Sequence, residues 1–483
     1  MITGASLTWS NLTCKVDKKS CFRKQSKTLL DNTSGSVKAG EILAILGPSG
    51  AGKSTLLNCL SENNCAGYKT TGNIFVDGYR MKNKMHSVSA YVEQNCEFFE
   101  KLTVYEHLVF HAKLSGIQPS ELEFRVQEVI DLLDMTDYLN SKIGCQGRGL
   151  SGGERKRLSF AAEIMVQPQL LFADEPTSGL DSFLASKVLD TIKKISAVGT
   201  TIIFTIHQPS SVLFSKLDNI YLLDGGKKVI SGKATDVSKE FTNAIGMNCP
   251  VGYNLADWYL DFIGSKSEKL MLLNPDLDNQ DKNADSIFTI SSAETSINHV
   301  KVTKWSKFIT AVSRAWRLQI RDTNIILLRY GNSLFIAFLL GMFYYREDAN
   351  YVGISETKGI PWLSDEIQDL NGCIFMVILI NVMMNMFFVC LHFTQAKSKW
   401  RREHYSGLLP ISYNYLASTV VEIVLYTLPS SIIFSAIVYV LTKLHQSKNA
   451  ILIHFVGQVL LANVGVSFGY RVILMFCFIK WMK

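Results

Sequence analysis

A glycine-rich loop near the N-terminus has the residue types that bind phosphate. It reads Gly47-Pro48-Ser49-Gly50-Ala51-Gly52-Lys53-Ser54-Thr55 and matches G-x-x-x-x-G-K-[ST] in full. The glycines let backbone N–H groups converge on an anion, Lys53 supplies a positive charge, and the Ser54 hydroxyl suits Mg²⁺. An apolar run at 41–46 precedes the loop. The sequence therefore predicts a phosphate site between a buried strand and the start of a helix.

A pair of acidic residues after a second apolar run can complete this site. The run Leu170–Ala173 predicts a strand, and Asp174 and Glu175 follow it directly. A carboxylate at a strand end, beside a phosphate loop, can hold Mg²⁺ through water, and its neighbour can orient or deprotonate an attacking water. We assign Asp174 to the metal and Glu175 to the catalytic base.

Two further polar residues follow short predicted strands. His207 ends the run 201–206, and ligands of open α/β sheets bind at such strand ends. We favour a catalytic contact from His207 to the γ-phosphate over an ordinary surface histidine. Gln94 also follows a short strand, and its amide is suited to touch Mg²⁺ or the attacking water. A surface glutamine is the alternative interpretation of Gln94.

The stretch Leu150-Ser151-Gly152-Gly153-Glu154 is a second signal for anion binding. A serine followed by two glycines can cap a helix and leave backbone N–H groups free for an anion. Because the chain already has a complete phosphate loop, this stretch raises the question of whose phosphate it binds.

In their order along the chain, these motifs resemble the ATPase domain of an ABC transporter. The motifs are the phosphate loop, Gln94, LSGGE at 150–154, LLFADEP, SGLD at 178–181, and His207. The continuation of the signature as Glu-Arg-Lys-Arg, with DEPTSGLDSF, TIHQPSS and CPVGYNLADWYLDFI, is similar to subfamily G. These are half-transporters with the ATPase domain first, here resembling the white/scarlet eye-pigment transporter group. One departure is NLADW at 254–258, where members often read NPADF.

The resemblance implies that the working unit is a dimer. In the family, residues at positions 151–153 contact the γ-phosphate of ATP bound to the opposing subunit, and Asp181 lies at the dimer interface. Gln94 would sense the nucleotide and touch the membrane domain, and Trp9 is a candidate for stacking on adenine. The implied cofactors are ATP and Mg²⁺. The implied partner is another half-transporter, in a homo- or heterodimer.

The elements that must position these residues divide the chain of 483 residues into unequal parts. We expect an α/β P-loop ATPase domain of ABC type at 1–264, a polar linker at 265–300, an amphipathic connecting helix at 301–323 and an all-α transmembrane domain at 324–483. The net charge of +7 is modest, and the basic residues gather beside the apolar runs. This pattern favours membrane lipid as a partner and argues against nucleic acid.

The connecting helix is expected to lie at the membrane surface. Its apolar residues recur at helical spacing on one face, and lysines and arginines surround them. The apolar residues are Trp305, Phe308, Ile309, Val312 and Trp316. A soluble packing helix is the alternative.

Four apolar segments are long enough to cross a bilayer, at about 325–345, 372–393, 417–441 and 450–468. The connection 346–371 has two basic residues against six acidic ones, whereas the connection 394–416 is basic. The positive-inside rule places the first connection outside and the second in the cytosol, beside the ATPase domain. We therefore expect a multi-pass protein of the plasma membrane or of an intracellular vesicle membrane.

Several polar residues fall inside the predicted spans. Asn381 and Asn385 share a helix face, where they either contact a transported substrate along a pathway or join helices; both interpretations stay open. Arg329 is expected to snorkel to the membrane surface. Glu422 is expected to reach the cytoplasmic interface rather than line a pathway, and Pro429 predicts a kink.

The membrane part holds fewer spans than the resemblance implies. Subfamily G members have six, and the expected fifth and sixth are missing. After residue 470, where the resemblance is expected to end, only eight consecutive apolar residues follow, at 472–479.

The sequence is therefore compatible with two functions. The first is ATP-driven transport of a small aromatic or pigment precursor, or of a lipid or sterol, by a dimer. The alternative is a truncated, non-transporting subunit that regulates or inhibits a full-length partner. A soluble ATPase of translation or repair is disfavoured by the four spans.

Overall fold

The computed structural model describes eleven ranges of the chain. They are residues 4–20, 23–63, 67–81, 84–95, 97–145, 148–245, 247–250, 253–262, 302–345, 365–442 and 447–482. The predicted linker at 265–300 lies outside them. The chain forms two compact units, one of Met1–Thr303 with Glu403–Leu408 and one of Lys304–Arg402 with Leu409–Lys483.

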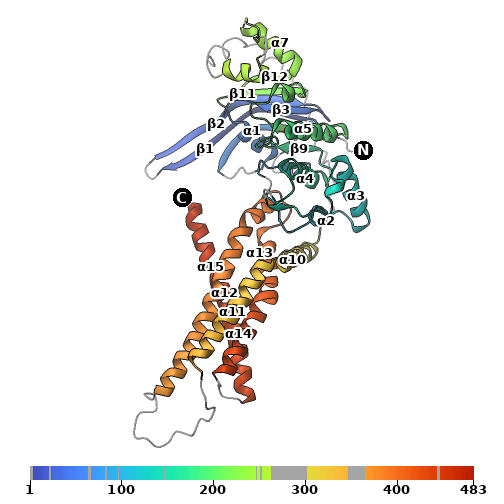
Figure 1. Cartoon of the computed structure of the whole chain (residues 1–483). Helices are drawn as coiled ribbons and strands as arrows, with labels where there is room; N and C mark the ends of the chain where they lie inside the picture. Colours follow the sequence, from blue (N-terminus) through green and yellow to red (C-terminus); the bar gives the residue numbers. More distant parts are fainter. Residues whose placement is uncertain are drawn as a thin grey trace, which may run out of the picture. The chain divides into compact units, whose positions relative to one another are not determined.

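A six-stranded sheet forms the centre of the first unit (Figure 1). Its strand order is β12 (Lys227–Lys233), β11 (Asn219–Asp224), β3 (Ile42–Leu46), β10 (Thr201–Thr205), β9 (Leu170–Ala173) and β6 (Ser89–Val92). All neighbours are parallel except β11 and β12. Every residue of β3, β9 and β10 is buried, as expected of parallel strands covered on both faces. The carboxyl ends of β3, β6, β9 and β10 therefore share one edge.

A second, antiparallel sheet packs against the first. Its order is β2 (Arg23–Val37), β1 (Leu7–Ser20), β4 (Tyr68–Val76) and β5 (Tyr79–Arg80). The long strands β1 and β2 are the blue hairpin of Figure 1. Apolar side chains of this sheet share one buried cluster with those of β3, β9, β10 and β11. The core thus joins the two sheets into one unit.

Helices surround the six-stranded sheet (Figure 1). Those that contact its strands are α1 (Lys53–Ser61), α5 (Ser182–Ala197), α7 (Ala234–Ile245) and α4 (Gly152–Ile164). The helices α2 (Val104–Ser115) and α3 (Pro119–Leu132) pack on α4. Smaller elements are η1 (Met85–Ser87), η2 (Thr136–Tyr138), β7 (Gly144–Cys145), β8 (Arg148–Gly149), α6 (Ser211–Phe214) and a helical segment at 255–262.

The described residues of the second unit form helices and short connections, with no strand among them. It consists of α10 (Lys304–Ile320), α11 (Thr323–Phe343), α12 (Asp365–Tyr405), α13 (Ile411–Glu422), η4 (Ile423–Thr427), α14 (Leu428–Leu441) and α15 (Lys448–Met482). Four helical stretches are long and apolar enough to cross a membrane: Thr323–Phe343, Asn371–Leu391, Ile411–Leu441 and Lys448–Val472. The expected α/β domain followed by an all-α helical domain is confirmed.

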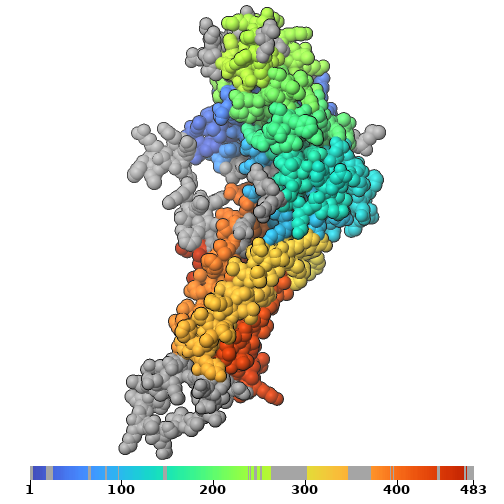
Figure 2. All heavy atoms as spheres, in the orientation of Figure 1, coloured from blue at the N-terminus to red at the C-terminus, as the bar shows by residue number. Residues whose placement is uncertain are grey.

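The outer faces of these helices are apolar. Leu327, Phe335 and Phe343 on α11 are 76%, 66% and 78% exposed, and Val440 on α14 is 72% exposed. Part of the α11 surface is the yellow-orange face of Figure 2. In water such a surface would be a liability, whereas lipid tails match it. The exposed apolar residues are therefore consistent with a bilayer around the second unit.

Two local features of this unit refine the expectations. The apolar run 472–479 lies within α15, which continues unbroken to Met482. The predicted kink at Pro429 takes the form of a π-helical turn, η4, which ends two residues before the proline. A proline lacks an N–H and crowds the preceding turn, so a change from α to π geometry there is physically reasonable.

Candidate functional site

The phosphate loop connects β3 to α1, as predicted. Ser49 and Gly50 lie exposed at its tip. Gly50 and Gly52 have φ of 81° and 100°, a left-handed conformation that glycine adopts without strain. The Lys53 ammonium donates to the carbonyls of Gly47 at 2.8 Å and Pro48 at 3.0 Å. Burial lowers the pKa of Lys53, and the charges of Glu175 and Asp174 oppose that shift.

The acidic pair lies beside the start of α1. The Ser54 hydroxyl donates to Asp174 Oδ1 at 3.0 Å, so a hydroxyl and a carboxylate oxygen meet where a metal-bound phosphate would lie. Thr205, at the end of the adjacent β10, donates to the same Oδ1 at 2.6 Å and accepts from the Glu175 N–H at 2.8 Å. Thr205 therefore fixes both carboxylate residues. Sequence reasoning missed it, although it is a hydroxyl two residues before His207.

Gln94 contacts the acidic pair directly. Its amide nitrogen donates to Glu175 Oε2 at 2.7 Å. Its backbone carbonyl accepts from the Lys156 ammonium of α4. Gln94 is thus positioned both by the signature helix and by the assigned base.

The backbone is unusual where β9 and β10 end. Glu175 and Gln208 both have φ of 41°, which is uncommon for residues other than glycine, asparagine and aspartate. Such conformations cost on the order of 1–3 kcal/mol and cluster at functional sites. His207, immediately before Gln208, has an exposed side chain. The strain therefore falls on Glu175 itself and on the residue directly after His207.

Residues 150–154 form the start of α4. Ser151 is the N-cap: its hydroxyl accepts from the Glu154 N–H at 3.4 Å, and the Glu154 carboxylate accepts from the Ser151 N–H at 2.9 Å. Ser151 and Gly152 are exposed, and Leu150 is buried beneath them. The Ser151 side chain therefore makes its hydrogen bond within its own turn. The exposed start of α4 thus belongs to a different element from the β3–α1 phosphate loop.

Asp181 caps the helix that packs against this turn. Its carboxylate accepts from the backbone N–H groups of Phe183 at 3.0 Å and Leu184 at 2.9 Å, which begins α5. A Cβ added to Gly153 would lie 3.1 Å from Leu184, and one added to Gly152 would lie 3.0 Å from Leu180. The glycines therefore let the exposed Asp181 segment approach the signature turn closely.

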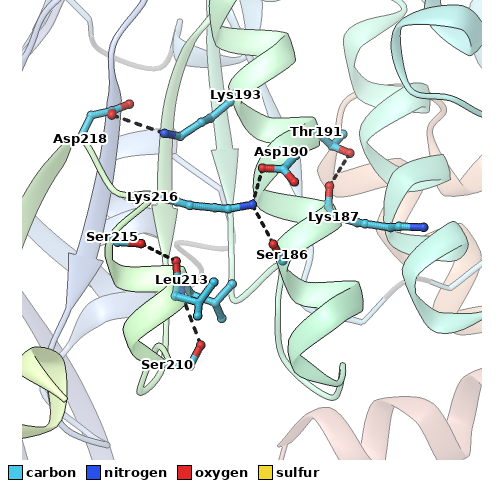
Figure 3. Close-up of polar contacts among 11 residues, drawn as sticks. Ser186, Lys187, Asp190, Thr191, Lys193, Ser210, Leu213, Ser215, Lys216 and Asp218 are labelled. Carbon is cyan, nitrogen blue, oxygen red and sulfur yellow. Dashed lines mark hydrogen bonds and ion pairs between the residues drawn. The ribbon is translucent and has the colours of Figure 1, made fainter. Parts of the chain in front are cut away.

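Surface polar contacts join α5 to the segment that follows His207 (Figure 3). The Lys216 ammonium lies 2.6 Å from Asp190 Oδ1 and 2.7 Å from the Ser186 hydroxyl. Lys193 lies 3.6 Å from Asp218. These contacts hold α5, which Asp181 caps, against the segment that contains Lys216 and Asp218.

Trp9 does not have the role the resemblance offered. It is 1% exposed, and its ring packs against Tyr221 with centroids 5.5 Å apart in the core between the sheets. The prediction of adenine stacking was wrong, because the alternation of β1 turns this side chain inward.

Two charged residues of the helical unit are also not where we expected them. Arg329 and Glu422 are 3% and 1% exposed and form an ion pair between α11 and the end of α13. The Arg329 guanidinium also lies over the rings of Tyr426 and Phe388, at 4.6 and 4.9 Å. The predictions that Arg329 snorkels and that Glu422 reaches the interface were wrong. Each charge is neutralised by the other inside the helical unit.

One basic residue of α10 departs from the amphipathic pattern as well. Trp305, Ile309 and Trp316 are exposed along one face, as expected for a helix at a membrane surface. Arg314, however, is 5% exposed, and its guanidinium donates to the Asn414 side chain on α13 at 2.8 Å. Arg314 therefore anchors α10 to the helical unit instead of facing lipid headgroups.

Asn381 of α12 joins helices, and Asn385 contacts it from the same helix. The Asn381 amide donates to the backbone and side-chain oxygens of Gln458 on α15, at 2.9 and 2.8 Å, and its Oδ1 accepts from Ser431 on α14 at 3.3 Å. Asn385 donates back to Asn381 at 3.0 Å. These contacts favour the helix-joining interpretation of Asn381.

A small cavity of about 10 Å³ lies beside the two asparagines, with Arg329, Ser333 and Ser430 also in its lining. Such a volume is near the minimum for one water molecule. In this conformation it has no room for an organic substrate.

The fold and the site together define a P-loop ATPase of the ABC type, joined to a helical membrane unit. The model of the ABC transporter domain matches residues 30–178, and the model of the ABC-2 type transporter matches residues 306–478. The second match extends past residue 470, so our expectation that the resemblance ends there was wrong.

Among curated proteins, the chain is 33% identical to protein white of Drosophila melanogaster over 92% of its length and 66% of that protein. It is 31% identical to protein scarlet of Drosophila melanogaster, over 96% of the chain and 71% of scarlet. It is 31% identical to the ABC transporter ATP-binding protein/permease wht-1 of Caenorhabditis elegans, over 98% of the chain and 75% of that protein. The chain belongs to the ABC transporters of subfamily G, in the group of white and scarlet, and spans 66% to 75% of the length of these relatives.

Proposed function

We propose that this chain is an ATP-hydrolysing subunit of a membrane transporter. The observation that carries the proposal is a cluster of hydrogen bonds at the shared strand edge. Ser54 donates to Asp174, and Thr205 links Asp174 to Glu175. Gln94 donates to the Glu175 carboxylate. Helices that can cross a membrane follow in the same chain. An ATPase and a membrane unit in one polypeptide favour coupling of hydrolysis to movement across the bilayer.

The residues around the phosphate loop fit Mg²⁺ with ATP. Ser54 Oγ and Asp174 Oδ1 are hard oxygen ligands 3.0 Å apart, the chemistry that Mg²⁺ prefers when phosphates and water complete its shell. Bound there, the metal would neutralise charge on the phosphates. Lys53 would exchange its two carbonyl partners for phosphate oxygens, Glu175 would accept a proton from the attacking water, and His207 would contact the γ-phosphate.

We infer that the working unit is a dimer. The exposed N-terminal turn of α4 has backbone N–H groups suited to a γ-phosphate, and the chain has its own phosphate loop on a different element. Two chains facing each other would complete two sites, each with one loop and one signature turn. A homodimer and a heterodimer with another half-transporter both satisfy this arrangement.

For the substrate, we propose a small aromatic pigment precursor or a lipid or sterol. The resemblance to the eye-pigment transporter group supports a pigment precursor, and the apolar surface of the helical unit supports a substrate that partitions into lipid. The ATPase unit would lie in the cytosol, with the helices in the plasma membrane or an intracellular vesicle membrane.

Replacement of Glu175 with Gln tests the ATPase assignment. The amide keeps the shape of the side chain but cannot accept the proton, so ATP hydrolysis should fall about 100-fold or more while ATP binding persists. The measurement is Mg-ATP turnover by the full chain in lipid vesicles, alone and with candidate partner subunits. Glu121→Gln on α3 is a matched control that should leave turnover unchanged. Normal turnover in Glu175→Gln would refute the assignment of the base.

Uptake of labelled candidate substrates by the same vesicles tests transport. We expect ATP-dependent uptake that Glu175→Gln abolishes. Hydrolysis without uptake, with every partner and substrate class, would support the non-transporting alternative.

A further inference from the structure

Lys156 is a buried cation of the ATPase unit whose ammonium group lies close to the catalytic cluster. It lies in α4, three residues after Gly153, and is 6% exposed. Its ammonium donates to the backbone carbonyl of Gln94, which follows β6. A buried ammonium is expensive unless it is hydrogen-bonded, so this contact has to compensate for lost hydration.

The neighbouring cations of α4 have different targets. Arg155 donates to the carbonyl of Gly144 at 2.7 Å, and Arg157 donates to the carbonyls of Leu133 and Asp134 at 3.3 and 3.1 Å. Gly144 begins β7, and Leu133 and Asp134 directly follow α3. Of these three consecutive basic residues, Lys156 is the one that donates to Gln94, beside the assigned catalytic base.

The contact continues into the catalytic cluster. Lys156 holds the backbone of Gln94, and the Gln94 side chain donates to Glu175 Oε2 at 2.7 Å. Glu175 in turn is held through its N–H by Thr205. A displacement of α4 would therefore change where the Gln94 amide meets Glu175.

In the proposed dimer, the start of α4 and Glu175 act on two different ATP molecules. The start of α4 would contact ATP of the opposing subunit, whereas Glu175 would act on the ATP held by the chain's own loop. We propose that Lys156 is a positioning residue that couples the signature helix to the orientation of Glu175 through Gln94. The role of Glu175 rests on the proposed function, and coupling between two ATP sites rests on the proposed dimer.

A double-mutant cycle tests the inference. Lys156→Met removes the cation but keeps an unbranched side chain of similar length, and Gln94→Ala removes the side chain that reaches Glu175 but keeps the backbone carbonyl. We expect Lys156→Met to lower kcat roughly tenfold, with KM for ATP changed less than about twofold, because a misplaced catalytic group slows the chemical step more than binding. In the Gln94→Ala background, Lys156→Met should lower kcat less than about twofold further, because both act through one contact.

Two variants keep the test specific. Arg157→Met removes a neighbouring cation that also donates to backbone carbonyls, and should leave kcat within about twofold. Lys156→Arg should recover most of kcat, since it keeps a charged donor. Should Lys156→Met fail to fold, Lys156→Gln, whose amide is too short to reach Gln94, replaces it in the cycle.

The outcomes separate this inference from the proposed function. Equal losses from Lys156→Met with and without the Gln94 side chain would overturn the coupling, as would an equal loss from Arg157→Met. A normal kcat in Lys156→Met, while Glu175→Gln is inactive, would refute the coupling and leave the ATPase assignment intact. Activity in Glu175→Gln would instead refute the assignment on which the coupling rests.

Discussion

The ATPase unit has an ion pair exposed to water, whereas the helical unit has one that is buried. In the ATPase unit, Lys216 pairs with Asp190 on the surface, with side chains 27% and 52% exposed. In the helical unit, Arg329 pairs with Glu422, with side chains 3% and 1% exposed. Water and salt screen the charges of the first pair, and water can hydrate either side chain when its partner is removed. The second pair has no such substitute, so the loss of either partner leaves a buried charge alone.

The same contrast applies to neutral polar groups. Asp181 and Ser151 are exposed, and their side chains cap helices by accepting from backbone N–H groups of their own turns. Asn381 satisfies its amide with groups from two other helices. Asp181 and Ser151 are thus positioned by their own turns, whereas Asn381 holds helices together.

The largest effect is expected from breaking the buried pair. Arg329→Met should destabilise the helical unit by about 3–5 kcal/mol, because Glu422 would remain as a buried, unpaired carboxylate. The measurement is unfolding of the full chain in mixed micelles titrated with a denaturing detergent and followed by helical circular dichroism.

The matching control removes both charges. Arg329→Met combined with Glu422→Met should restore most of the stability lost in the single variant, since no lone charge remains. If the double variant is as unstable as the sum of the single variants, the pair is not the reason for the effect.

An intermediate effect is expected for the asparagine that joins three helices. Asn381→Ala should cost about 1–2 kcal/mol in the same titration, because Gln458 and Ser431 lose a buried partner. Asn463 provides a matched control, since its amide donates to the Val459 carbonyl of its own helix. Asn463→Ala should change stability by less than about 0.5 kcal/mol, and an equal loss in both variants would contradict the helix-joining role.

The smallest effect is expected at the surface. Lys216→Met should cost less than about 1 kcal/mol, and the difference from the unchanged protein should shrink further in 1 M salt, where charges are screened beyond roughly 3 Å. Thermal unfolding of the ATPase unit, followed in the full chain by tryptophan fluorescence at low and high salt, measures this. A loss as large as that of Arg329→Met would remove the distinction between the two kinds of pair.

Much of the ATPase site was predictable because its parts are local. The phosphate loop, the acidic pair after β9 and the cap of α4 each depend on a few consecutive residues and on the strand or helix beside them. Parallel strands then bring Asp174, Glu175 and His207 to one edge, which the pattern of short apolar runs already indicates. Our assignments of catalytic role remain predictions, since they depend on bound nucleotide.

Other features could not be predicted, for reasons that differ between residues. Thr205 looks like one more residue of an apolar strand until β9 lies beside it. Lys156 looks like one of three equivalent cations until α4 is placed against Gln94. Arg329 near the start of an apolar span is compatible with snorkelling, and only its distant partner Glu422 decides otherwise. Trp9 is compatible with a ligand contact by residue type alone, and only its position in β1 places it in the core.

The sequence by itself determined the class of protein, the order of its two units, the phosphate loop and the four apolar spans. These depend on residue type and on spacing within a single element, which the chain carries wherever it folds. Only the tertiary structure decided which charges are paired, which helix supports Gln94 and whether Asn381 joins helices. Those outcomes require residues far apart in sequence to meet, here 93 positions for Arg329 and Glu422 and 62 for Lys156 and Gln94. No local pattern records such a meeting, because burial and pairing belong to the packed helices and sheets rather than to either residue alone.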